Sequence, residues 1–355
     1  MERAQFFSKL IFLVFFINAC NSNNPESTTV ETVLYENTQT VIASDDGVIE
    51  RPSNLVQIHG ERMYVLDYGR LEILEISAEG GKVVNSFGRK GKGPGELTLS
   101  SNLLKNNDKI ILHNTKRASL SFFSPEGDFE STVPLNIPIS LSADMAVYKD
   151  WILMSALEKD NGIVDLASLK DLSENRISLG DTTIGNLPTS VNFDEYNSAI
   201  RNGEVPKVFK DDVLTLFDEK ANIYLVYHAE NRVQKYSNLG ELLWDKKVPF
   251  PESDLVFESF IEANTNNTFN RIISLRYFTE ANHYEDRLYL LVTLNDKKSS
   301  FILVIDDESG VVEKRIEFSG LDFDPTGFAY HPLLDAFFFI DRQGPALVKV
   351  TKDNG

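Results

Sequence analysis

A short apolar motif recurs six times along this chain, and it restricts the possible folds more strongly than any other feature of the sequence. Each copy is a run of large apolar residues, and the copies span residues 63–67, 110–114, 151–155, 223–227, 288–292 and 337–341. Runs rich in Val, Ile, Leu, Tyr and Phe are typical of β-strands. Six copies of one unit predict a repeat architecture.

The spacing of the copies identifies the unit. Their last residues are separated by 47, 41, 72, 65 and 49 positions. A propeller blade of four strands needs about 40 to 50 residues, so three intervals fit directly and two carry insertions. Further apolar runs and glycine-containing turns flank each copy. The sequence therefore predicts an all-β, six-bladed β-propeller.

The last blade is one strand short. It offers strands only at about 327–331, 337–341 and 346–351, whereas the segment 30–43 at the other end of the chain is a spare strand. We expect this N-terminal strand to close the last blade, because closure removes the open sheet edges that favour aggregation. The chain has a single cysteine, so no internal disulfide assists this closure.

The first 20 residues have the order of a secretory signal: basic Arg3 and Lys9, an apolar run at 10–17, then small residues. The run is too short to cross a bilayer as a helix. Residues 17–20 resemble a lipobox, which predicts removal of 1–19, lipid attachment at Cys20 and a flexible tether at 20–29. The propeller would then occupy 30–355. Cleavage at another position, or a buried N-terminal strand, is the alternative.

The charge of the chain restricts its partners. The formal net charge is −18 and the isoelectric point is about 4.8. An acidic surface repels phosphate backbones, so nucleic acid is excluded as a partner. The expected partners are the membrane, through acylated Cys20, and an envelope protein, a small molecule or a glycan.

The most specific local string is residues 86–97, Ser-Phe-Gly-Arg-Lys-Gly-Lys-Gly-Pro-Gly-Glu-Leu. Its glycines and proline mark a long loop between elements, suited to joining the outer strand of one blade to the inner strand of the next. The string resembles the inter-blade linker of NHL-repeat and TolB-like propellers, and closely the first such linker of six-bladed propeller lipoproteins from Gram-negative envelopes. Residues 63–73 and 222–236 resemble the NHL core pattern. The resemblance implies fold and an outer-membrane location, and it brings no catalytic residues.

Two insertions, at about 180–212 and 249–285, depart from the repeat. Extra loop length on a rigid scaffold is a functional hint, and aromatic residues with arginine are typical of binding surfaces. Residues 252–263 could form a short amphipathic helix over one face. The alternative is that the aromatic side chains only pack against the body. The candidate binding residues are Phe193, Tyr196, Arg201, Phe257, Phe260, Phe269 and Arg271.

Two histidines, His59 and His331, follow the innermost strands of the first and last blades and could share a channel mouth. The histidine spacing matches no metal site, so no metal or cofactor is expected. Asp67 and Asp341 occupy equivalent repeat positions and are interpreted as turn-capping residues. The acidic run at 306–308 is interpreted as a solvated turn.

The leading functional hypothesis is a cell-envelope lipoprotein whose propeller binds a ligand or a protein. One alternative is a propeller lyase or hydrolase that uses channel-facing histidines and carboxylates, which is an analogy at the level of fold. Another alternative is an accessory subunit of outer-membrane nutrient uptake. The sequence shows no catalytic constellation that favours either.

Overall fold

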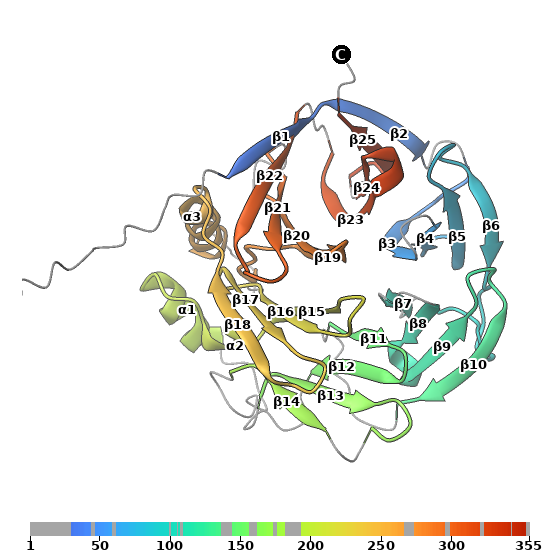
Figure 1. Cartoon of the computed structure of the whole chain (residues 1–355), viewed down its shortest axis with the longest axis horizontal. Helices are drawn as coiled ribbons and strands as arrows, with labels where there is room; N and C mark the ends of the chain where they lie inside the picture. Colours follow the sequence, from blue (N-terminus) through green and yellow to red (C-terminus); the bar gives the residue numbers. More distant parts are fainter. Residues whose placement is uncertain are drawn as a thin grey trace, which may run out of the picture.

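The computed structural model describes residues 30–43, 47–58, 62–98, 101–104, 106, 109–135, 144–155, 162–172, 176–181, 193–265, 273–294, 299–319, 323–341 and 343–352. Six sheets stand around a common centre, as the sequence predicted (Figure 1). Within each sheet, strands run antiparallel from an inner to an outer position, with the N-terminal segment as the exception described below. No helix in these ranges is long and apolar enough to span a membrane.

The six blades follow one another along the chain. Blades one to three consist of β3 (Pro52–Ile58), β4 (Arg62–Asp67), β5 (Glu72–Ser77) and β6 (Val83–Phe87); β7 (Ser101–Leu104), β8 (Ile110–Asn114), β9 (Ser119–Phe123) and β10 (Phe129–Pro134); and β11 (Ala146–Tyr148), β12 (Trp151–Ser155), β13 (Val164–Ser168) and β14 (Ile177–Leu179). Blades four to six consist of β15 (Val213–Phe217), β16 (Ile223–Tyr227), β17 (Arg232–Tyr236) and β18 (Leu242–Lys247); β19 (Glu280–Tyr284), β20 (Arg287–Val292), β21 (Phe301–Asp306) and β22 (Val312–Phe318); and β23 (Pro325–His331), β24 (Ala336–Asp341) and β25 (Ala346–Thr351).

The six recurring motifs are the second strands of the six blades: β4, β8, β12, β16, β20 and β24. Neighbouring blades cover both faces of these strands, and every residue of β8 and β16 is buried. A strand covered on both faces reads as a continuous apolar run because neither set of alternating side chains meets water. This burial explains why the second strand gave the clearest repeat signal.

The N-terminal segment closes the ring and does more than the sequence predicted. β2 (Asn37–Ala43) pairs antiparallel with β25 and completes the sixth blade, which confirms the predicted closure. β1 (Glu31–Tyr35) pairs in parallel with β22 and gives the fifth blade an additional outer strand. At the crossing between them, the amide of Glu36 donates to the carbonyl of Thr351 (3.1 Å). One continuous segment therefore joins two blades, as Figure 1 shows.

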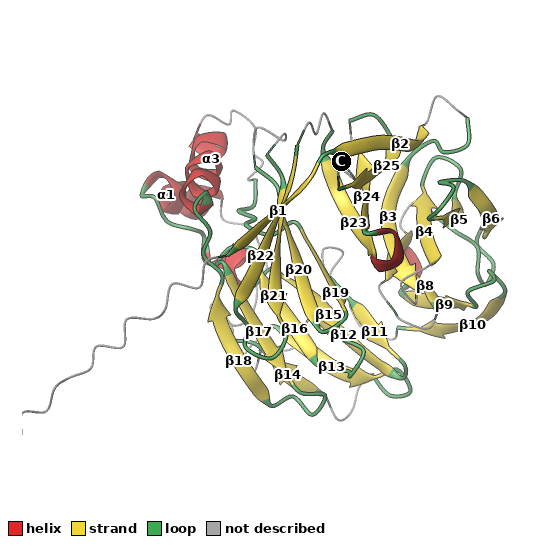
Figure 2. Ribbon diagram, turned by 45° about the horizontal axis from the view of Figure 1, so that its top comes forward, coloured by secondary structure: helices red, strands yellow, loops and turns green. Residues whose placement is uncertain are grey.

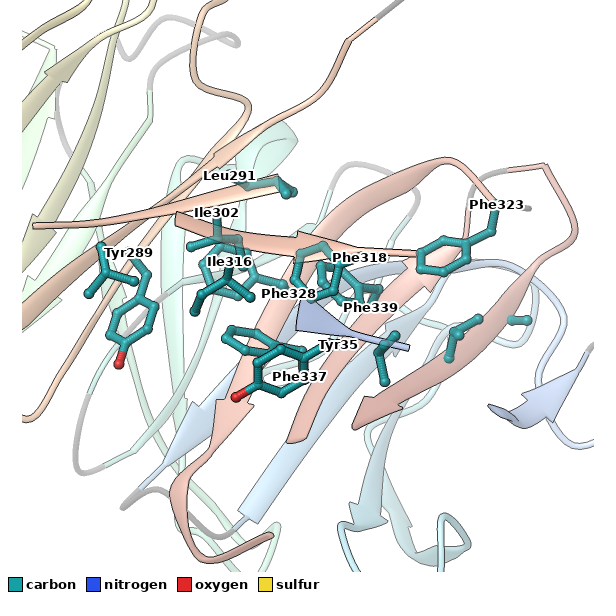
Figure 3. Close-up of a cluster of buried hydrophobic side chains, with 14 residues drawn as sticks. Tyr35, Tyr289, Leu291, Ile302, Ile316, Phe318, Phe323, Phe328, Phe337 and Phe339 are labelled. Atoms are coloured by element: carbon teal, nitrogen blue, oxygen red, sulfur yellow. The ribbon is translucent and has the colours of Figure 1, made fainter. Parts of the chain in front are cut away.

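The junction between blades five and six contains a dense aromatic core (Figure 3). The ring of Tyr35 from β1 meets the ring of Phe337 edge-on at 5.1 Å, and Phe318 meets Phe339 in the same manner at 5.0 Å. Such edge-to-face pairs add about 0.5 to 1.5 kcal/mol to the gain from burial. The Tyr35 hydroxyl donates to Asp335, so the N-terminal strand is fixed by both apolar and polar contacts.

The glycine-rich string connects the outer strand β6 to the inner strand β7, as predicted. Its ends are held together because the amide of Leu97 donates to the carbonyl of Arg89 (2.8 Å) and the amide of Gly91 donates to the carbonyl of Leu97 (3.0 Å). Gly88 has a φ of +75°, and a Cβ there would lie 2.4 Å from the Leu97 side chain. Glycine is required at this position for both reasons.

Candidate functional site: the helix-bearing face and the channel

In the described residues, three α-helices interrupt the repeat, and they lie in the connections on either side of the fourth blade. α1 (Phe193–Arg201) and α2 (Lys207–Lys210) lie between β14 and β15, and α3 (Ser253–Thr265) lies between β18 and β19. The predicted helix at 252–263 is confirmed by α3, whereas α1 and α2 were not predicted. Figure 2 shows α1 and α3 side by side above one face of the disc. The two insertions therefore converge although they are separated by a whole blade.

An apolar cluster holds the helices together. The ring of Phe209 lies 6.4 Å from those of Tyr196 and Phe260, and Phe257 lies 6.2 Å from Phe260. Ile200 of α1 is buried in the same cluster. Burial of these side chains against one another is the reason the insertions fold into a defined cap.

The candidate binding residues are thus used in different ways. Phe260 is buried and Phe257 is half-buried in this cluster, and the half-buried Tyr196 contacts Phe209 of α2. Arg201 is exposed at the end of α1 and donates through Nε to the carbonyl of Asn197 (3.1 Å).

The remaining candidates have separate positions. Phe193 begins α1. His331 is buried at the end of β23 and is not among the residues that line the described channel cavity. The predictions for Cys20, His59, Phe269 and Arg271 lie outside the described residues.

A cavity of about 510 Å³ lies beneath α3. Its volume is in the range of about 300 to 1,000 Å³ that small-molecule sites occupy, and such sites are mostly apolar with a few polar groups. The apolar lining residues are Leu255, Val256, Phe260, Ala263, Ile273, Leu275 and Leu294. The polar lining residues are Ser259, Ser274, Arg276, Thr279, Thr293 and Asp324.

The polar groups of this cavity are held in place by the surrounding elements. Arg276 donates through Nη2 to Asp212 (3.4 Å), and the Thr279 and Thr293 hydroxyls lie 3.1 Å apart. The amide of Asp324 donates to Asp341 (3.1 Å). The cavity therefore combines an apolar wall with hydroxyl, carboxylate and guanidinium groups.

A second, smaller cavity of about 180 Å³ occupies the central channel and is lined by residues of all six blades. Residues close together in the chain line the two cavities. Thr279 and Asp324 line the cavity beneath α3, whereas Glu280 and Thr326 line the channel. Its polar lining residues are Ser53, Asn54, Asn102, His113, Asp144, Thr215, Glu280 and Thr326. Burial lowers the pKa of His113 to about 4, so its imidazole is neutral at pH 7.

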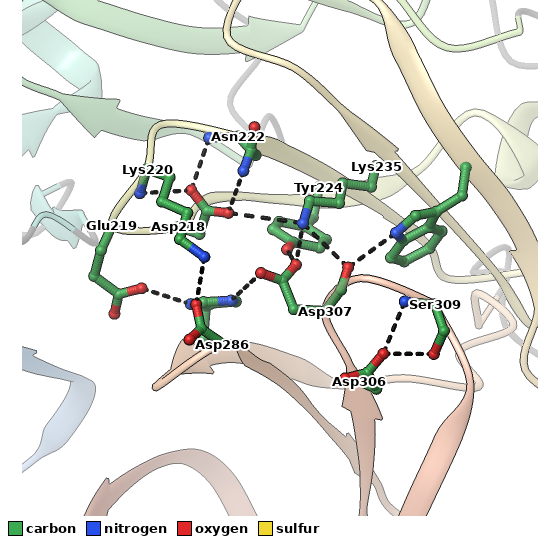
Figure 4. A network of polar contacts seen from close by, with 12 residues as sticks. Asp218, Glu219, Lys220, Asn222, Tyr224, Lys235, Asp286, Asp306, Asp307 and Ser309 are labelled. Atoms are coloured by element: carbon green, nitrogen blue, oxygen red, sulfur yellow. Dashed lines mark hydrogen bonds and ion pairs between the residues drawn. The ribbon is translucent and has the colours of Figure 1, made fainter.

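A cluster of charged side chains lies between blades four and five (Figure 4). Asp218, His283 and Asp307 bring a nitrogen and two carboxylate oxygens within 4.8 Å of one another. This is a donor set that could hold a metal ion. However, the Lys235 ammonium is bonded to Asp307 and lies 4.0 Å from Asp218. The lysine supplies the positive charge that a metal would bring, so the cluster is an internal ion network.

The network also fixes the charge of its histidine. Burial alone lowers the pKa of His283, but the carboxylates of Asp307 and Glu219 outweigh it and raise that pKa to about 9. Nδ1 lies 3.0 Å from Glu219 and Nε2 lies 3.7 Å from Asp307. Burial also opposes ionisation of Asp307, yet its contacts with His283, Lys235 and Tyr224 keep its pKa well below the usual range. The imidazolium therefore links a hairpin of blade four to one of blade five.

Sequence reasoning missed this network. Asp307 is 2% exposed, so the interpretation of residues 306–308 as a solvated turn is wrong at its centre. Asp306 does form the turn, since its carboxylate accepts from the amide of Ser309 (2.8 Å). The strand that carries Lys235 also contains Arg232 and Gln234, so its local sequence gave no distinctive signal that this lysine is buried.

The interpretation of Asp67 and Asp341 as turn-capping residues is confirmed. Asp67 accepts from the amides of Arg51 (2.8 Å) and Gly69 (2.9 Å). Asp341 accepts from the amides of Gln343 (2.9 Å) and Gly344 (3.1 Å). Their carboxylates satisfy backbone donors at turns, as aspartate commonly does.

Comparison with known families places the fold in context. The family DUF5128, described as 6-bladed beta-propeller, matches residues 41–322. The chain belongs to this family. The match confirms the resemblance to six-bladed propellers that the linker and the core motif suggested. No curated protein is significantly similar to the chain in sequence.

Similar solved structures share the fold. A Bacteroides fragilis protein named as a candidate exported protein is 11% identical, with a TM-score of 0.51, covering 92% of this chain and 100% of its own. A DUF4221 family member from Bacteroides vulgatus is 8% identical, with a TM-score of 0.52, covering 86% and 92%. A streptogramin B lyase is 10% identical, with a TM-score of 0.48, covering 89% and 97%. At these identities the similarity to the two Bacteroides structures is one of fold alone.

Proposed function

We propose that this DUF5128 propeller is a lipid-anchored protein of the cell envelope that binds a small, largely apolar molecule beneath α3. One observation carries the binding proposal: the two insertions converge on one face, and α3 covers a cavity of about 510 Å³. A rigid disc with added loops at one face is a common arrangement for binding sites. The predominantly apolar wall favours a ligand with an apolar body, and Arg276 and Asp324 favour polar substituents.

The proposed location in the cell envelope is supported by the sequence. The signal-like residues 1–19 and the lipobox-like residues 17–20 place an acylated Cys20 ten positions before Val30, where the described chain begins. The name of the similar Bacteroides fragilis protein agrees with export. Several acyl chains on one cysteine would give stable anchoring.

Native mass spectrometry of the protein purified from its own cells tests the binding proposal. The purified protein is expected to carry a stoichiometric small molecule, which denaturation releases. Ala263→Trp places a large ring in the cavity and is expected to abolish the added mass. Glu262→Trp introduces the same side chain at an exposed position of α3 and should retain it. A wild-type protein without any added mass, or equal masses in both variants, would contradict the proposal.

Metabolic labelling with an alkyne fatty acid tests the lipid attachment and the membrane location separately. The wild type is expected to be labelled and to sediment with membranes, and Cys20→Ala should lose both properties. Labelling that persists in the variant would show that the anchor is elsewhere.

A further inference from the structure

The channel cavity, which the proposed ligand site does not use, contains buried polar groups without partners. Nε2 of His113 and Oγ1 of Thr215 have no hydrogen-bond partner in the part of the chain that the structure describes, and the two residues are 3% exposed. Both residues line the cavity of about 180 Å³. A buried polar atom without a partner is destabilising, so such atoms in a native protein call for an explanation.

The charged residues that line the cavity around these atoms are acidic. Asp144 and Glu280 line the same cavity, and none of the described lining residues is Lys or Arg. The position of Asp144 is fixed, because its carboxylate accepts from the amide of Thr215 (2.7 Å). A cleft lined by one sign of charge concentrates ions of the opposite sign, and the net charge of −18 acts in the same direction.

We infer that the channel binds a small organic cation, a primary amine in its ammonium form, which donates hydrogen bonds to Thr215 and His113. The carboxylates of Asp144 and Glu280 balance its charge. The neutral imidazole of His113 suits this role, since a protonated ring would offer no acceptor. The cavity has the volume of roughly six water molecules at about 30 Å³ each, which limits the ligand to a short amine.

The geometry favours an organic ion over a bare metal. Among the described residues, the acidic and histidine side chains that come close enough together to share one ion are Asp218, His283 and Asp307, and none of these lines the channel. The channel carboxylates and His113 come from three different blades, and an organic cation can place its ammonium and its other polar groups beside residues of different blades.

Gly327 provides a way to block the site. It lines the channel, its φ is not positive, and a Cβ there would meet only Glu280 Oε2, at 3.9 Å. A larger side chain at this position would therefore extend into the cavity without straining the backbone. Gly327→Val is expected to exclude the ligand while the propeller remains folded.

Isothermal titration of the full-length chain with ethanolamine tests the inference, with ethylene glycol as the neutral and glycolate as the anionic analogue. Ethanolamine is expected to bind saturably at one site, and the two analogues are not. Thr215→Val and Asp144→Asn should weaken binding at least about tenfold, and Gly327→Val should abolish it. Thr38→Val, an identical change on the exposed part of β2, should have no effect.

Thermal unfolding separates loss of binding from loss of fold. If the unpaired hydroxyl serves a ligand, Thr215→Val should leave the melting temperature of the free protein unchanged or raise it, because an unsatisfied buried group is removed. Absence of saturable binding, equal binding of ethylene glycol, or unchanged affinity in Thr215→Val and Asp144→Asn would overturn the inference and indicate ordered water only. Ala263→Trp should leave ethanolamine binding intact, so the two sites can fail independently.

Discussion

The two junctions on either side of the fifth blade are stabilised by different kinds of interaction. Between blades five and six, aromatic rings fill the interface, and Tyr35 from the N-terminal strand is one of them (Figure 3). Between blades four and five, an apolar interior is supplemented at the hairpins by a buried ion network centred on Asp307 (Figure 4). Apolar contacts lose energy in proportion to the atoms removed, whereas the members of a buried network depend on one another.

This difference predicts how each junction fails. In the aromatic junction, every remaining ring keeps most of its neighbours when one is truncated. In the ion network, removal of one charge leaves another buried without compensation, which is costly however small the change in volume. The two junctions should therefore differ in the kind of substitution that lowers the free energy of unfolding most. Loss of ring volume should matter most in one, and loss of a single charge in the other.

The largest effect is expected for Phe337→Ala. Phe337 is fully buried and its ring lies 4.8 Å from that of Tyr330 and 5.5 Å from that of Phe318. The free energy of unfolding should fall by about 4 kcal/mol, as for other buried Phe to Ala changes. Chemical denaturation measures this value. Leu333→Ala, at a 77% exposed position nearby, should change it by less than about 0.5 kcal/mol.

Lys235→Met should lower the free energy of unfolding by about 3 kcal/mol, because it leaves Asp307 without its buried ammonium partner. Lys220→Met is the matched control. Lys220 pairs with Asp286 at 2.7 Å, but both side chains are largely exposed, so no measurable loss of stability is expected.

Adding Asp307→Asn to Lys235→Met sharpens the comparison. The double variant removes the carboxylate that Lys235→Met leaves with His283 as its cationic partner, and it should recover part of the loss. The single variant Asp307→Asn is measured as well. If the losses of the two single variants simply add in the double variant, the two residues are independent, and the network description is wrong.

The stability of the ion junction should depend on pH through His283. Its pKa in the folded protein, about 9, is above the ordinary value of about 6.5. Its contribution is therefore fully present below pH 6.5 and is lost as pH rises through 9. Unfolding curves of wild type and His283→Gln should differ by about 1 to 2 kcal/mol at pH 6 and converge above pH 9. A difference that is constant over this range would refute the charged state of His283.

The smallest effect is expected at the polar contact of the aromatic junction. Tyr35→Phe keeps the ring and removes the hydroxyl that donates to Asp335. Asp335 retains Tyr330 (3.0 Å) and Lys352 (2.6 Å), so a loss of about 1 kcal/mol is expected from thermal unfolding. A loss as large as that of Phe337→Ala would mean that this junction also depends on a polar network.

Much of the fold was predictable because its signals are local. The second strands are apolar on both faces, the glycine-rich linker has a distinctive composition, and the helix near 252–263 has helical spacing of apolar residues. The spare strand at 30–43 could be assigned to the last blade because that blade lacked one. Its division between two blades was not predictable, since the parallel pairing of Val33 with Ile316 leaves no mark in either segment.

The candidate sites were less predictable because they depend on distant pairs. The aromatic residues of the insertions were found, but their packing into a cap depends on contacts between α1 and α3, which lie on opposite sides of a whole blade in the chain. The channel residues Asp144 and Thr215 have no distinctive local sequence context. Their role follows from the radial arrangement of inner strands.

The sequence by itself determined the blade count and the closure, because periodicity and a missing strand can be read along the chain. Lipid attachment at Cys20 stays a prediction from the leader-like segment. Only the tertiary structure decided which polar side chains are buried together. Asp307 and Lys235 are separated by 72 positions, and the packing of blade five against blade four brings them into contact. Burial then makes their charges matter, since water no longer screens them.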